Sequence, residues 1–182
     1  TYTSYADQKS LQPYRFTRDV SEGGFYYREY NIYRHSDSSV YSVLKVKEKP
    51  LKLDTFPIKK NSFDVLSLVY ESRSIDFSSK RIGDRILLRM VIDRGTHDIF
   101  IRYLGTDTYE HDELGEIECY VFSPLLVEGS IFKAGEGMQV WVSKDNNRIP
   151  IFIESEIRVG TIRSELIEYS GLRFPLGSKS RN

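Results

Sequence analysis

The sequence has little cysteine and little alanine, and it has no long apolar run. Cys119 is the one cysteine among 182 residues, so an intramolecular disulfide is excluded. Alanine occurs only at Ala6 and Ala134, which removes the best helix-forming residue from most of the chain. No stretch approaches the roughly 20 apolar residues that a membrane-spanning helix needs. The sequence therefore predicts neither a fold stabilised by disulfides nor a membrane-spanning helix.

An excess of one charge is also absent. The 26 Lys and Arg residues balance 26 Asp and Glu residues. A general nucleic-acid or membrane-surface binder normally carries a basic excess, so neither kind of partner is predicted. The N-terminus, Thr1 to Tyr5, lacks a methionine and the features of a signal peptide. We interpret Thr1 as an internal position of a longer protein, so the lack of a signal peptide here does not indicate a cytosolic location.

Aromatic residues are abundant, with 13 Tyr, 10 Phe and one Trp. Aromatic and β-branched residues favour strands, and turn signals such as Glu22-Gly23-Gly24 separate runs that alternate with period two. Only Ser62–Arg73 has helical spacing, with Ser62 or Asn61 as its N-cap. We predict a mainly β fold, in which an antiparallel curved sheet or half-open barrel packs around this one short helix. The length suits a single domain over residues 1–176, followed by a frayed tail at 177–182.

The motifs of common catalytic and cofactor sites do not occur. The sequence has no phosphate-binding glycine loop, no Gly-x-Ser-x-Gly elbow and no His-Glu-x-x-His helix, so we predict no cofactor and no enzyme. His35, His97 and His111 lie beside predicted turns and are expected to be solvated, although a zinc site assembled from distant segments stays open. Cys119 alternates with Ile117 and Val121, which predicts a buried small side chain.

Acidic residues are densest between Asp107 and Glu118. This stretch coincides with a predicted hairpin tip and lacks the spacing of a calcium loop, so we interpret it as a solvated turn. Weak cation binding and catalysis are the alternatives.

The run Phe25–Arg34 interleaves aromatic residues with arginine. Alternation places Phe25, Tyr27 and Tyr33 on one face of a strand, and the opposite face carries Tyr26, Arg28, Tyr30, Ile32 and Arg34. Such a face can stack on sugars or bases, or it can simply cover a half-exposed sheet.

Two acids lie within apolar sequence. Glu128 is flanked by Leu125–Val127 and Ile131–Phe132, and Glu154 alternates with isoleucines. If the sheet curves strongly, such acids can point inward and pair with Arg102 or Arg163. Buried ion pairs and functional sites look the same at this level.

The chain resembles the bacterial family called domain of unknown function 3108 over nearly its whole length. The resemblance rests on short blocks in order, which are Glu22-Gly23-Gly24, Asp64-Val65-Leu66-Ser67, Ile82-Gly83-Asp84, Arg102-Tyr103-Leu104-Gly105, Gly115–Cys119, Glu128–Phe132, Trp141–Asp145 with Asn147–Ile151, and Val159–Ile162. It implies an exported, periplasmic envelope protein without an assigned activity. Family members begin with a signal sequence and further strands, so this chain is expected to lack N-terminal strands of the full-length protein.

We therefore expect a non-enzymatic exported envelope protein that binds a hydrophobic or lipid-like ligand in a concave sheet. The alternative is a structural or interaction module that binds a protein or glycan through the aromatic strand face, and a hydrolase is a third class. The partner expected is a lipid-like ligand or an envelope protein. The candidate contact residues are Tyr26, Arg28, Tyr30, Arg102, Glu128, Trp141 and Glu154.

Overall fold

The computed structural model describes residues 1–125, 135–157 and 160–179 of the chain. Its strands are β1 (Tyr2–Ala6), β2 (Pro13–Glu22), β3 (Phe25–Arg34), β4 (Ser39–Val46), β5 (Lys52–Pro57), β6 (Arg85–Ile92), β7 (Gly95–His111), β8 (Gly115–Pro124), β9 (Met138–Ser143), β10 (Pro150–Glu156), β11 (Thr161–Glu165) and β12 (Ser178–Lys179). The helix α1 spans Val65–Ser72. The predicted mainly antiparallel β fold with one short helix is confirmed, and the strands form two sheets, neither of which closes into a barrel over these residues. No helix in the described part of the chain has the length and hydropathy of a membrane span.

The chain divides into two compact units. Unit 1 contains Thr1–Ser74 and Leu88–Asp98, and unit 2 contains Ile75–Leu87 and Ile99–Asn182. Strands β6 and β7 therefore contribute residues to both units. The expectation of a single β-rich domain over residues 1–176 stays a prediction.

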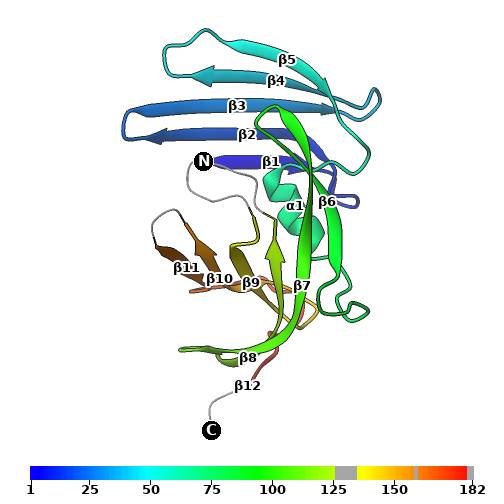
Figure 1. Ribbon diagram of the computed structural model, residues 1–182, viewed down its shortest axis with the longest axis vertical. Coiled ribbons are helices and arrows are strands. Elements are labelled where there is room, and N and C mark those ends of the chain that lie inside the picture. The colour runs from blue at the N-terminus through cyan, green and yellow to red at the C-terminus, as the bar shows by residue number, and fades with distance from the viewer. Residues whose placement is uncertain (126–134, 158–159, 180–182) are drawn as a thin grey trace. The chain divides into compact units, whose positions relative to one another are not determined.

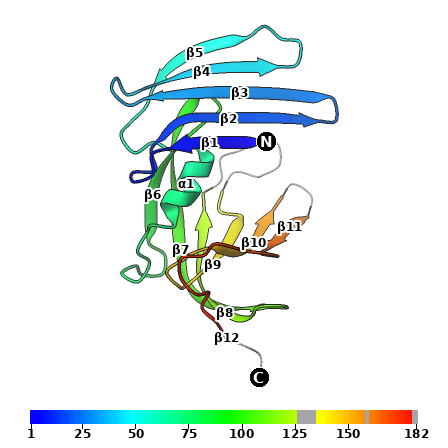
Figure 2. The same ribbon diagram turned by 180° about the vertical axis from the view of Figure 1, so that it is seen from behind.

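Unit 1 is built on the five-stranded sheet β1-β2-β3-β4-β5, whose strands follow one another in sequence order (Figure 1). Tight turns and short loops connect them, which is the usual arrangement of an antiparallel meander. The helix α1 lies beside β1 in both ribbon views (Figures 1 and 2). Each strand thus presents alternate side chains to two faces of one sheet.

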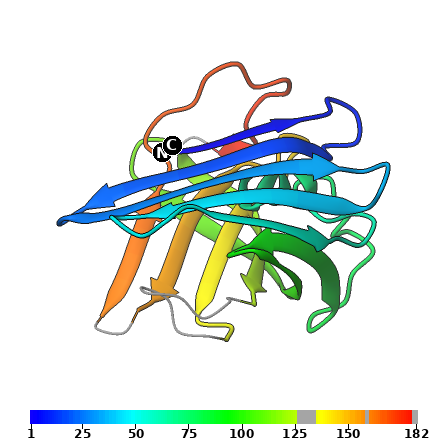
Figure 3. The ribbon, with the colours of Figure 1, turned by 90° about the horizontal axis from the view of Figure 1, so that it is seen from above.

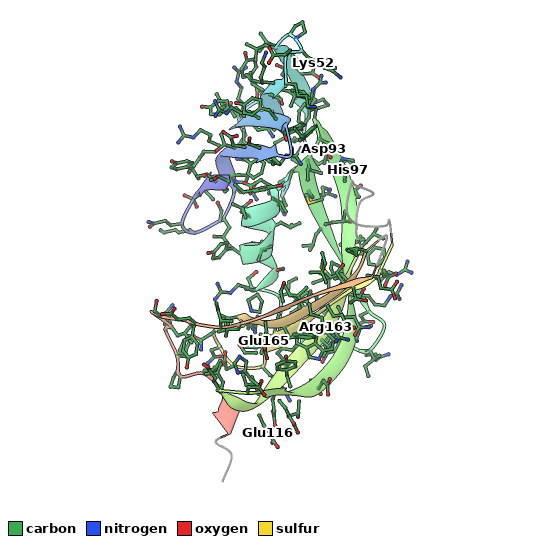
Figure 4. The ribbon with its side chains drawn as sticks, turned by 90° about the vertical axis from the view of Figure 1, so that its left-hand side faces the viewer. Lys52, Asp93, His97, Glu116, Arg163 and Glu165 are labelled. Atoms are coloured by element: carbon green, nitrogen blue, oxygen red, sulfur yellow. The ribbon has the colours of Figure 1, made fainter. Side chains whose placement is uncertain are left out.

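One face of this sheet carries the core of unit 1, and we call it the inner face. Its buried apolar side chains are Phe16, Tyr33 and Val40, and they pack with Ile58 and with Val91 of β6. We call the opposite side the outer face. Figure 4 shows Asp93 and His97 on one side of the sheet, whereas side chains on the other side point into open space.

The helix begins later than the sequence predicts. Asp64 is the N-cap, because its carboxylate accepts hydrogen bonds from the backbone N–H groups of Leu66 and Ser67 at 2.9 and 3.0 Å. The predicted caps Ser62 and Asn61 are wrong. The backbone of Phe63 is extended and exchanges hydrogen bonds with β6, so helical geometry cannot start before residue 64.

Unit 2 contains most of the second sheet, in the order β11-β10-β9-β8-β7-β6, with β12 beside β8. Figure 3 shows β9, β10 and β11 side by side. Part of the segment expected to fray, Ser178–Lys179, pairs with Ile117 and Glu116 of β8. Residues 180–182 lie outside the described residues.

Two apolar clusters hold unit 2 together. Phe77 is buried against Tyr103, Tyr120 and Phe122, with ring centroids 5.5 to 5.6 Å apart. The second cluster centres on Ile117, Cys119 and Ile151. Cys119 is fully buried, as the alternation of its strand predicts, and burial raises the pKa of its thiol to about 12.

Candidate functional site

Three of the candidate residues, Tyr26, Arg28 and Tyr30, share the outer face of the sheet in unit 1. They occupy alternate positions of β3, and Ile32 and Arg34 continue the same row. The register places Thr17 and Val43 on either side of Tyr30, and it places Asp19 and Lys45 on either side of Arg28. The predicted alternation of this aromatic strand is therefore confirmed.

Arginine and tyrosine side chains pair repeatedly on this outer face. The guanidinium carbon of Arg15 lies 4.0 Å from the ring centroid of Tyr5, and those of Arg28 and Arg34 lie 5.6 Å from Tyr26 and Tyr41. Hydrogen bonding to the Tyr30 and Tyr5 hydroxyls raises the pKa of Arg15. Stacking of this kind orients a guanidinium while leaving donors free for a partner.

The outer face is basic. Its strand positions carry four cations, Arg15, Arg28, Arg34 and Lys45, against the single carboxylate of Asp19. Asp19 is already engaged, because its Oδ2 accepts from Arg28 Nε at 2.8 Å. An approaching group would therefore meet positive charge among aromatic rings.

The inner face carries polar residues that the sequence analysis did not single out. Glu29, Asn31 and Ser42 are fully buried there. Glu29 accepts hydrogen bonds from Tyr27 Oη at 3.3 Å and from Asn31 Nδ2 at 3.1 Å, and Arg18 Nη2 lies 3.3 Å from its Oε2. Burial, followed by the Glu29 charge, raises the pKa of Tyr27 to about 12. The charge of Glu29 is thus compensated within unit 1.

The turn between β6 and β7 is tied to this inner face by two ion pairs of opposite polarity. Asp93 Oδ1 accepts from Arg18 Nη2 of β2 at 2.5 Å, and the neighbouring Arg94 donates to Asp54 of β5. Both turn residues adopt positive φ, 51° and 63°. Their side chains therefore reach the second and the fifth strand of the same sheet.

Trp141 and Glu154 share one face of the sheet in unit 2. The register places Trp141 opposite Phe152, and Glu154 follows two residues later on the same side of β10. Glu154 does pair with Arg163, whose Nε lies 2.6 Å from Oε2, but Arg163 is largely exposed, so the pair does not point into a core. Figure 4 shows Arg163 and Glu165, which both come from β11.

Around Trp141, aromatic rings form a row. The Phe152 ring lies 5.3 Å from Trp141 and stacks at 4.9 Å on Tyr109. Trp141 Nε1 donates to Asp107 Oδ2 at 3.1 Å, and Tyr109 Oη donates to Glu165 at 2.7 Å. Burial and this hydrogen bond raise the pKa of Tyr109 to about 12. The row is half-buried, with its polar atoms directed to carboxylates.

The remaining two candidates lie elsewhere. Arg102 forms a bidentate pair with Glu136, with N–O distances of 2.5 and 2.8 Å, and this pair holds the pKa of Glu136 below its usual value. Glu128 lies outside the described residues.

The histidines do not form a metal site with the acids in the described part of the chain. The prediction that His111 is solvated is wrong, because the side chain is buried and its Nε2 lies 2.6 Å from the Leu166 carbonyl oxygen. Its Nδ1 accepts from the N–H groups of Glu113 and Leu114, so the ring serves to fix the β7–β8 turn. Among residues 1–125, 135–157 and 160–179, no group of three or more His, Cys, Asp or Glu has the arrangement of a metal site.

Comparison with known proteins gives a family. Residues 1–167 match the model of a family described as Protein of unknown function (DUF3108). The chain belongs to this family. The match covers all of unit 1 and reaches through β11, so the outer face of unit 1 and the aromatic row of unit 2 are both parts of the DUF3108 region. No curated protein and no solved structure matches the chain.

Proposed function

We propose that this chain is a non-enzymatic, exported envelope protein, and that it binds an acidic protein partner through the outer face of unit 1. The observation that carries the proposal is the row of arginine–tyrosine pairs on one open sheet face. Export and the envelope location rest on what resemblance to the family implies. Binding rather than catalysis rests on the sequence, which has none of the catalytic motifs considered above.

The composition of the outer face favours a protein partner over a glycan. Arginine and tyrosine are enriched at the centres of protein interfaces, where lysine and acids are depleted. The outer face has three arginines and four tyrosines around the half-buried Ile32 and Val43, with one lysine and one acid. Because the arginines are already stacked on rings, little side-chain entropy is lost when a partner docks.

Charge determines the partner's chemistry. The surplus cations would pair with carboxylates of the partner, and such pairs mainly raise the association rate and select against basic competitors. Binding should therefore weaken as salt is raised from about 0.05 to 0.5 M, because exposed charges are screened within a few ångströms at high ionic strength.

The experiment places a photo-crosslinking amino acid at Thr17, which lies opposite Tyr30, in the full-length protein in its native envelope. We expect a discrete protein adduct, which would then be purified for affinity measurement. Arg15→Ser with Arg34→Ser should weaken binding of that partner at least about tenfold, since arginines at interface centres contribute most. Lys9→Ser and Lys80→Ser remove the same charge from exposed loops and should leave affinity unchanged. An adduct that contains no second polypeptide, and whose added mass is removed by glycosidase, contradicts the protein partner.

A second candidate function is binding of a hydrophobic or lipid-like ligand by the sheet of unit 2. It is favoured by the aromatic row of Tyr109, Trp141 and Phe152, which is half-buried and offers ring faces of the kind that pack against acyl chains. Native mass spectrometry of the gently purified full-length protein tests it. A reproducible added mass that Trp141→Ala removes would support this function, and a clean apo mass in both proteins would contradict it.

A further inference from the structure

Several buried polar atoms of unit 1 have no hydrogen-bond partner in the described part of the chain. Five of the atoms concerned are Arg18 Nε, Asn31 Oδ1, Tyr33 Oη, Ser42 Oγ and Arg94 Nε. A buried polar atom without a partner loses the hydrogen bonds it made to water, at a cost of about 1–3 kcal/mol. Five such atoms on one small unit therefore require an explanation.

The register brings several of these atoms together on the inner face. Asn31 of β3 lies directly opposite Ser42 of β4, and Ser42 lies directly opposite Asp54 of β5. The Asp54 carboxylate pairs with Arg94. A single cross-strand row thus runs from the Asn31 amide through the Ser42 hydroxyl to the Arg94 guanidinium, with neighbouring Cβ atoms about 5 Å apart within the sheet.

The orientation of the Asn31 amide is set by its neighbour. Its Nδ2 donates to Glu29 Oε1 at 3.1 Å, and a carboxylate can only accept, so the nitrogen must face Glu29. The amide oxygen is then directed away from Glu29 and requires a donor. In the next row, Arg18 contacts the same Glu29 through Nη2, which leaves its Nε–H without an acceptor.

The unpartnered atoms are of mixed chemistry. The two Nε–H groups can only donate, the Asn31 oxygen can only accept, and the two hydroxyls can do both. An anion would satisfy only the donors, and a cation would satisfy only the acceptors. Water both donates and accepts, and buried waters typically make about three hydrogen bonds to such groups.

We propose that the inner face of unit 1 is an internal hydration site, where one ordered water bridges Asn31 Oδ1 and Ser42 Oγ and further waters accept from Arg18 Nε and Arg94 Nε. The bound waters complete the hydrogen bonding between the sheet and the β6–β7 turn. They make this polar layer part of the folded structure rather than a defect in its core.

The test begins with the unaltered protein, so it does not depend on a variant folding. A crystal structure at about 1.5 Å should show a water within 2.6–3.2 Å of both Asn31 Oδ1 and Ser42 Oγ. Water oxygen-17 relaxation dispersion should detect long-lived internal waters in solution. An empty inner face, with Ser42 donating directly to Asn31, would overturn the proposal. A density peak about 2.4 Å from several oxygens would also overturn it, because that distance indicates a metal cation.

Variants then locate the water. Ser42→Val replaces the hydroxyl with a larger apolar side chain and should lower the number of long-lived waters by about one, since a bridging water needs both of its partners. Ser21→Ala, which removes an exposed hydroxyl from β2, should leave that number unchanged. Ser42→Ala serves the same purpose with a smaller change in shape. An unchanged dispersion in both Ser42 variants would place the water elsewhere and contradict the assignment.

Discussion

Arg18 Nη2 lies 2.5 Å from Asp93 Oδ1 and 3.3 Å from Glu29 Oε2, so one guanidinium serves an exposed and a buried carboxylate. The Asp93 side chain is 59% exposed, whereas that of Glu29 is fully buried. The same cation therefore makes one pair in water and another in the core of unit 1. The two pairs differ in their electrostatic environment and should differ in their contribution to stability.

We expect Glu29→Ala to lower the free energy of unfolding by about 3–5 kcal/mol, because it removes the buried carboxylate that pairs with Arg18 and leaves the Asn31 amide without its acceptor. Asp93→Ala removes the exposed partner of the same guanidinium and should cost only about 1 kcal/mol. Urea denaturation of both variants measures the difference. Equal losses would contradict the separate roles of the two carboxylates.

The N-cap of α1 gives a second prediction. Asp64→Ala removes the acceptor of two backbone N–H groups and of the Ser4 hydroxyl, which donates at 2.6 Å, and it should destabilise the protein by about 2 kcal/mol. Asp64→Asn keeps a capping oxygen and should recover most of this loss. Ser72→Ala, at the exposed end of the helix, is the matched control. If Asp64→Ala costs no more than Ser72→Ala, Asp64 does not cap the helix.

The thiol of Cys119 should be inert in the folded protein. Only the thiolate reacts, and burial raises the pKa of Cys119 to about 12, well above the usual value near 8.5. Labelling with iodoacetamide at pH 8 should therefore be at least about a hundredfold slower in the native protein than in urea. Fast labelling of the native protein would show that β8 opens locally.

Alkaline pH should destabilise the protein. Tyr27 and Tyr109 have pKa values of about 12 in the folded state and about 10 when unfolded. Between pH 10 and 12 the unfolded chain has released these protons while the folded chain still holds them, so the free energy of unfolding falls as pH rises. This contribution to stability is fully present below about pH 10.

Urea midpoints at pH 8 and pH 11 measure this fall. Tyr27→Phe with Tyr109→Phe should reduce it, whereas Tyr70→Phe, at an exposed helix position, should not. A fall of the same size in the double variant would mean that other groups cause the alkaline loss.

The single-domain prediction can be tested with Trp141, the only tryptophan. Trp141 lies in unit 2 and Glu29 in unit 1, while β6 and β7 contribute residues to both units. If the chain unfolds as one domain, Glu29→Ala should lower the urea midpoint reported by Trp141 fluorescence. An unchanged Trp141 midpoint, with a lowered midpoint by far-ultraviolet circular dichroism, would show that the units unfold separately.

The sequence predicts the strands better than the polar interior. Alternation correctly places Tyr26, Arg28 and Tyr30 on one face, because period two is a local property of a strand. It could not assign that face to solvent, since the opposite face of β3 also carries polar side chains at Glu29 and Asn31. A buried acid becomes recognisable only when the strands that supply its partners are known, and strand pairing is not local.

Contacts between residues far apart in the sequence also explain the other differences between prediction and structure. His111 looks like a loop histidine because it adjoins a turn, yet its acceptor on Leu166 comes from 55 residues away. The sequence predicts too early a helix start because Ser62 and Asn61 are good capping residues in isolation, and the pairing of Phe63 with β6 does not show in the local sequence. Five of the seven candidate contact residues fall into two groups. Tyr26, Arg28 and Tyr30 share the outer face of unit 1, and Trp141 and Glu154 share one face of the sheet in unit 2. Side-chain spacing within and between neighbouring strands accounts for both.

Asp93 and Arg94 also show a conflict between backbone and side-chain requirements. Positive φ at two consecutive positions is the geometry in which glycine is least strained, and a non-glycine residue there costs about 1 kcal/mol. Glycine, however, has no side chain to reach Arg18 or Asp54. A glycine at either position would therefore relax the backbone but remove one of the two ion pairs that hold the turn to the sheet. A β-branched residue would fit neither the backbone conformation nor the ion pair.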